Sequence, residues 1–141
     1  MYYLFKNSGL REKLYMEDNK PCYNDQFRGR TKRFAINLCK IFDDLPKKES
    51  TRVITRQLLW SGTSIAANFR AATRARSAAE YYSKLCIVVE ECDETVFGLE
   101  LIEELLPPYN QKFIELCKEA SELLKVFSMT KKKLKERLKN K

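Results

Sequence analysis

Residues 57–69 form the stretch that most limits what this chain can fold into. None of them is charged, although 33% of the whole chain is charged. Small side chains fill the stretch, and arginines flank it, Arg56 before and Arg70 after. Wound at about 100° per residue, the stretch is uncharged on every side, which is typical of a helix buried on every side. In a chain this short, we infer that a second copy of the chain covers the outward side.

The outward side of this helix carries uncharged residues where a solvated helix would carry charge. We therefore predict that a subunit interface is formed by Leu59, Trp60, Thr63, Ala66 and Ala67.

The composition predicts one helical domain in a reducing compartment. The chain has 141 residues, with only four glycines, four prolines and no histidine. It is rich in Leu, Glu, Lys, Arg and Ala, the residue types that favour helix over sheet. The five cysteines form no CxxC pair. Four of them, Cys39, Cys86, Cys92 and Cys117, lie in apolar helical patterns and are read as core residues, and the odd number fits a reducing cytoplasm. Neither a secretion signal nor a run of about 20 apolar residues is present, and we expect a soluble, cytoplasmic protein with no membrane contact.

Apolar spacing predicts four helices. The first covers about 30–44 and ends before Pro46, and the second begins with Ser50 or Thr51 as its N-cap and continues to about residue 74. A capping box, Ser77 with Glu80, starts the third helix, and the fourth follows residues 107–108. Short joins between long helices predict an all-α, antiparallel up-down-up-down four-helix bundle. The expected division is an irregular or hairpin-like extension at 1–27, the bundle at 28–130 and a basic helix end or tail at 131–141.

No arrangement of residues points to catalysis. Seven carboxylates lie between residues 90 and 104 of the third helix, but a bundle di-iron site normally uses Glu-x-x-His pairs, and the chain has no histidine. No phosphate-binding loop, catalytic triad or dinucleotide fingerprint is found. We predict a protein that is not an enzyme and holds no metal or cofactor.

Charge is unevenly distributed along the chain. Residues 1–84 carry a net charge of +9, residues 85–128 carry −7, and residues 129–141 carry +6. On the second helix, four arginines share one side over about 33 Å at 1.5 Å per residue. Such cations neutralise phosphates without reading sequence, and the predicted nucleic-acid contacts are Arg52, Arg56, Arg70, Arg74, Arg76, Lys84, Lys131, Lys132 and Lys133. The alternative is that some arginines pair with the acidic third helix of the same or a neighbouring subunit.

One run of residues resembles the signature of a small bacterial family. The run is Ser61-Gly62-Thr63-Ser64-Ile65-Ala66-Ala67-Asn68, followed by Arg70-Ala71-Ala72 and Arg74-Ala75-Arg76-Ser77. The family is the four-helix bundle family that includes proteins encoded by intervening sequences in large-subunit ribosomal RNA genes. The resemblance covers roughly residues 28–130.

The resemblance implies a bundle that assembles into a homopentameric ring. A relative in the family is the accessory protein of diversity-generating retroelements, which binds nucleic acid and a reverse transcriptase.

We therefore expect a non-enzymatic, oligomeric protein that binds the RNA backbone through its arginine-rich face. The alternative is a protein-interaction scaffold, such as an accessory subunit to a reverse transcriptase, without nucleic-acid binding of its own.

Overall fold

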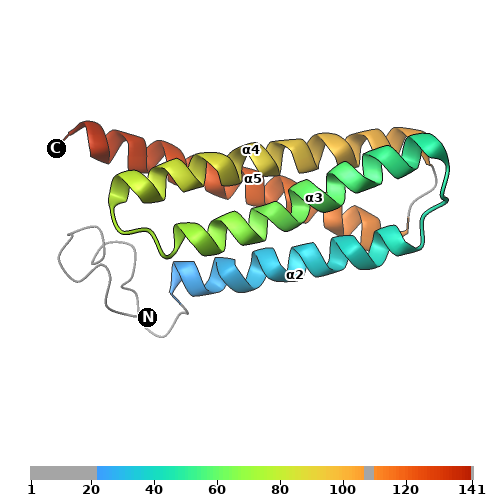
Figure 1. Cartoon of the computed structure of the whole chain (residues 1–141), viewed down its shortest axis with the longest axis horizontal. Coiled ribbons are helices and arrows are strands. Elements are labelled where there is room, and N and C mark those ends of the chain that lie inside the picture. Colours follow the sequence, from blue (N-terminus) through green and yellow to red (C-terminus); the bar gives the residue numbers. More distant parts are fainter. Residues whose placement is uncertain (1–21, 107–109, 141) are drawn as a thin grey trace.

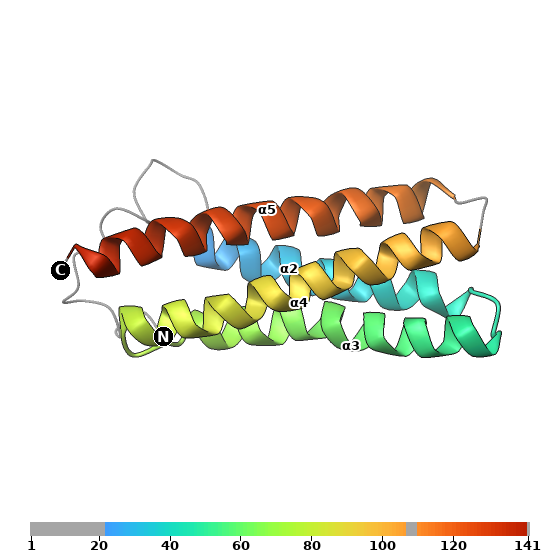
Figure 2. The ribbon, with the colours of Figure 1, turned by 90° about the horizontal axis from the view of Figure 1, so that it is seen from above.

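The structure, a computed structural model, describes residues 22–106 and 110–140. In these ranges every regular element is an α-helix: α2 (Tyr23–Asp43), α3 (Glu49–Ala72), α4 (Ala78–Leu105) and α5 (Gln111–Lys139). Figures 1 and 2 show the four helices lying lengthwise beside one another. Within these described residues, the prediction of an all-α fold with four helices is confirmed.

The helices form a bundle in which α2 and α4 occupy opposite corners. α3 packs against α2 and α4, and α5 packs against the same two helices. The core is made of large side chains from all four helices, including Phe34, Leu58, Ile102, Leu123 and Phe127. Burying a side chain of this size contributes roughly 1.5–3 kcal/mol, so the interior stabilises the bundle.

The closest packing joins α3 to α4. The Leu58 side chain lies against Gly98, where a Cβ would come within 2.6 Å of Leu58 Cγ. One turn along, the Thr95 and Ser61 hydroxyls are 2.9 Å apart in the core. Since residue numbers rise along α3 as they fall along α4, the two helices run in opposite directions, and a glycine sits where their backbones come closest.

Hydrogen bonds and an ion pair join α2 to α5. The Tyr23 hydroxyl lies 2.9 Å from the Thr130 hydroxyl, and the Arg30 guanidinium donates to both carboxylate oxygens of Glu119 at 2.5 and 2.8 Å. The start of α2 therefore lies beside the last third of α5, at the left of Figure 1.

α2 begins at Tyr23, before the predicted start at residue 30, so residues 23–27 belong to the helix and not to an N-terminal extension. Its buried stripe continues back through Thr31 to Phe27. Gly29 lies inside the helix, on its exposed side, and does not end it. The rest of the predicted extension lies outside the described residues.

The predicted N-cap is found at α4 but not at α3. Ser77 caps α4 and accepts from the Glu80 amide at 3.1 Å. The N-cap of α3 is Lys48, not Ser50 or Thr51. The Thr51 hydroxyl instead donates to the Pro46 carbonyl at 2.8 Å, because its side chain is buried inside the first turn.

Candidate nucleic-acid interface

Cations from two separate parts of the chain gather where α2 begins. Phe69 directly precedes Arg70, and its ring centroid is 6.4 Å from that of Tyr23. Thr130 directly precedes Lys131 and bonds to the same tyrosine. We call this group the basic end; its residues are Arg70, Arg74, Arg76, Lys131, Lys132 and Lys133.

An aromatic cluster lies beneath the basic end. Tyr23, Phe27, Phe69 and Phe127 contact one another, with ring centroids 4.6–6.4 Å apart. The three phenylalanines are buried, and burial raises the pKa of the Tyr23 phenol. Because these rings come from α2, α3 and α5, they fix the relative positions of the helix ends that carry the cations.

The join between α3 and α4 directs two arginines outward. Ala72 and Ala75 are fully buried, whereas Arg74 and Arg76 are exposed. The Arg76 amide donates to a Glu80 carboxylate oxygen at 2.9 Å, and this bond is the main reason that the pKa of the Glu80 carboxyl is lowered. In the predicted capping box that carboxylate would reach the Ser77 amide, so the contact lies one residue earlier than expected.

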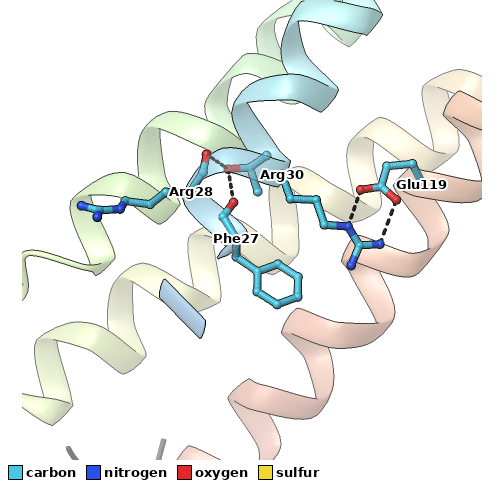
Figure 3. Close-up of polar contacts among 5 residues, drawn as sticks. Phe27, Arg28, Arg30 and Glu119 are labelled. Atoms are coloured by element: carbon cyan, nitrogen blue, oxygen red, sulfur yellow. Dashed lines mark hydrogen bonds and ion pairs between the residues drawn. The ribbon is translucent and has the colours of Figure 1, made fainter. Parts of the chain in front are cut away.

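Two arginines near the start of α2 differ in whether they are available to a ligand. Arg30 is held by Glu119 and lies over the Phe27 ring, with its guanidinium carbon 5.4 Å from the centroid. These hydrogen bonds raise the pKa of the guanidinium. Figure 3 shows Arg28 extending away from this contact; it pairs with Asp25 in an exposed position. Arg28 therefore adds a cation near the basic end that sequence reasoning missed, because the predicted helix began after it.

The structure separates two of the predicted contacts from the others. Arg52 and Arg56 lie in the first two turns of α3, at the opposite end of the bundle, and Arg52 is 3.7 Å from Glu49. The 14 residues from Arg56 to Arg70 correspond to about 21 Å of helix. Lys84, half-buried in the second turn of α4, lies on the side of the basic end.

The residues of the predicted subunit interface are partly exposed to solvent in a single copy of the chain. Trp60 is 75% exposed, Thr63 and Ala67 are exposed, and Leu59 and Ala66 are half-buried. The Thr63 hydroxyl is turned back onto its own helix, where it donates to the Leu59 carbonyl at 2.7 Å. The five residues therefore present a surface of low polarity on the outside of α3.

The described ranges hold neither a metal-binding cluster nor a membrane-spanning helix. No group of three or more acidic or cysteine side chains there is arranged to hold a metal ion. All five cysteines are free thiols. Of the helices described, none is long and apolar enough to cross a bilayer.

The described helices make this a small α-helical protein with cations at one end of its bundle. Residues 26–129 match the 23S rRNA-intervening sequence protein family. The chain belongs to this family, which confirms the resemblance seen in its sequence.

A solved structure agrees with the fold. The chain is similar to a protein of unknown function from the S23 ribosomal protein family of Bacteroides thetaiotaomicron, with 28% sequence identity and a TM-score of 0.68. The similarity covers 77% of this chain and 97% of the other. No curated protein matches the chain.

Proposed function

We propose that this protein is a non-enzymatic nucleic-acid-binding protein that holds the phosphate backbone of RNA at its basic end. The observation that carries the proposal is that six cations, from the last turn of α3, the α3–α4 join and the last third of α5, lie at one end of the bundle. Within the described part of the chain, Arg70, Arg74, Lys132 and Lys133 are exposed and form no ion pair. Their charge is therefore available for phosphates.

The membership in a family named for ribosomal RNA intervening sequences supports RNA as the polyanion. Guanidinium and ammonium groups on a solvated surface neutralise phosphates without contacting base edges. We therefore propose backbone binding with little sequence preference.

We also infer that copies associate through the outward side of α3, and that the complete assembly is the ring of five that the family resemblance implies. In such a ring each basic end would be repeated around one rim. Repetition would raise the effective concentration of cations seen by one RNA.

The test is a filter-binding titration of a hairpin RNA at 50 and 200 mM salt. Six phosphate contacts predict that affinity falls about 10³-fold between the two salt concentrations. Arg70→Glu with Arg74→Glu should weaken binding at least about tenfold.

The matched control is Arg52→Glu with Arg56→Glu, which makes the same charge change at the opposite end of α3. We expect this control to stay within about twofold of the unmodified protein, because its arginines lie about 21 Å away. Binding that ignores salt, or equal losses in the two double variants, would contradict the proposal.

A protein-interaction role is the second candidate function. Exposed apolar side chains on α4, surrounded by carboxylates, favour it because RNA phosphates would be repelled there. A reverse transcriptase as the partner remains an expectation from the family resemblance.

A further inference from the structure

The first turns of α2 bring further cations next to the basic end. Arg28 lies at the level of Arg70, because the residues that directly precede them, Phe27 and Phe69, face each other with ring centroids 6.3 Å apart. Figure 3 shows Arg28 turned away from the contact between α2 and α5. Its guanidinium therefore lies on the side of α2 nearer to α3 and to the basic end.

Two more cations follow on the outward side of α2. Lys32 comes one turn after Arg28, and Arg33 is its neighbour. Both side chains are exposed, and neither forms an ion pair across residues 22–106 and 110–140. The rise from Arg28 to Arg33 is about 7.5 Å at 1.5 Å per residue. We call Arg28, Lys32 and Arg33 the α2 extension.

The α2 extension belongs to a part of the bundle with charge of one sign. Neither aspartate nor glutamate occurs in residues 26–42 or 50–79, which make up most of α2, most of α3 and the α3–α4 join. The solvated side of a helix normally mixes both signs. α5 follows that rule, because its cations are interspersed with Glu115, Glu119, Glu122 and Glu136. The charge on α2 and α3 is therefore not explained by solubility alone.

A polyanion fits the α2 extension better than a second copy of the chain. Ile36, 44% exposed, is the one large exposed apolar side chain on α2. A protein contact there would desolvate Lys32 and Arg33 while burying little apolar surface in return. Pairing between copies also leaves charge over, since 27 basic residues meet 19 acidic ones and +8 remains on each copy.

We propose that RNA bound at the basic end continues onto the α2 extension, so that its phosphates are neutralised along the first three turns of α2 as well. The inference rests on the proposed function and adds the direction in which the RNA leaves the basic end. That direction leads away from α4, which lies at the opposite corner of the bundle. No lysine or arginine occurs between residues 85 and 111, so the carboxylates of α4 would repel phosphates.

Asp25 is the one carboxylate within reach of the α2 extension that the structure shows in contact with it. It pairs with Arg28 in an exposed position. An exposed ion pair is worth little in water, so a phosphate can take the place of the carboxylate. Asp25 therefore competes with RNA for Arg28.

The first test is a titration of the full chain with the same hairpin RNA at salt concentrations from 50 to 200 mM. We expect Lys32→Gln with Arg33→Gln to weaken binding about tenfold or more at 50 mM salt. The slope of log affinity against log salt should become shallower by about two, one for each phosphate contact removed.

The matched control is Lys47→Gln with Lys48→Gln, the same loss of two charges at exposed positions beyond the other end of α2. It should leave the slope unchanged and the affinity within about twofold, because these lysines lie outside the proposed path.

The second test looks for a gain of affinity. Asp25→Asn removes the competitor of phosphate at Arg28 and should strengthen binding about threefold. Asp43→Asn makes the same charge change at the last residue of α2 and should have no effect. A general loss of negative charge would strengthen both variants alike, which would contradict the proposed path.

The outcomes separate this inference from the function on which it rests. Equal losses in the two glutamine double variants, with Arg70→Glu and Arg74→Glu still weakening binding, would overturn the α2 extension and leave the basic end as the site. Full affinity in the Arg70→Glu and Arg74→Glu variant would overturn both. Sedimentation in which Lys32→Gln with Arg33→Gln dissociates the unliganded protein would also overturn the extension, since a second copy would then cover α2.

Discussion

At the scale of single residues, Gly98 limits how closely α3 and α4 can approach. A Cβ at this position would lie 2.6 and 2.8 Å from two carbons of Leu58, whose side chain is fully buried. Because Leu58 is buried in the core, its side chain cannot move aside into solvent, so we expect Gly98→Ala to lower the free energy of unfolding by about 1–3 kcal/mol. Urea denaturation followed by circular dichroism measures the change.

Gly29→Ala is the control for this prediction. Nothing lies within 4 Å of a Cβ built at Gly29, on the exposed side of α2. The same substitution should therefore stabilise the protein by about 0.5–1 kcal/mol through helix propensity alone. If both alanine variants were stabilised, the close contact at Gly98 would be wrong.

The thiols should differ in reactivity according to their burial. Burial, followed by the charges of Glu91 and Asp93, raises the pKa of Cys92 to about 12. Only the thiolate reacts, so we expect iodoacetamide at pH 8 to modify Cys92 last and the half-buried Cys39 and Cys86 earlier, as measured by peptide mass spectrometry. Modification of the Cys92 thiol before those of Cys39 and Cys86 would contradict its place in the core.

The same shift predicts how stability depends on pH. The folded-state pKa of Cys92 lies above the ordinary thiol value of 9.0. The folded protein therefore holds its proton while the unfolded chain loses it. The contribution of Cys92 to stability is complete below pH 9 and decreases as the pH rises from 9 toward 12.

At the scale of the helix, the beginning of α4 depends on one hydroxyl. Ser77 accepts from the Glu80 amide, and Glu80 in turn accepts from the Arg76 amide. Ser77→Ala should lower the free energy of unfolding by about 1 kcal/mol. Ser83→Ala, an exposed change inside the same helix, should be neutral or slightly stabilising. Thermal unfolding in which the two variants behave alike would argue against the cap.

The sequence predicts this helix start well and the start of α2 poorly, for a physical reason. A cap is local: its donor and acceptor are three residues apart, and their pattern is visible in the chain. The start of α2 depends on Phe27 reaching Phe69 and Phe127, which are distant in sequence. No local pattern indicates that contact, whereas Gly29 argues against a helix there.

At the scale of the whole molecule, the outward side of α3 bears on self-association. Ala67 is exposed in the single chain, so Ala67→Arg should leave the fold intact. It should still dissociate the proposed assembly, because it places a charge in a closed contact. Analytical ultracentrifugation should find a smaller species for this variant and an unchanged oligomer for Ser121→Arg on α5. The same oligomer in all three proteins would contradict the proposed interface.

The candidate site was predictable only in part for a similar reason. Periodicity along α3 correctly places Arg52, Arg56 and Arg70 outward, whereas Arg74 lies in the α3–α4 join. Periodicity cannot say which end of the helix meets the lysines of α5. That juxtaposition depends on Tyr23 bonding to Thr130.

Trp60 is the only tryptophan in the chain, and it projects from the outside of α3 instead of filling the interior. Its intrinsic fluorescence should therefore change little when the bundle is denatured, so emission spectra would be a poor guide to melting. The same indole becomes a built-in reporter of events at the surface, since any molecule that covers it would shift its emission to shorter wavelength without an added dye.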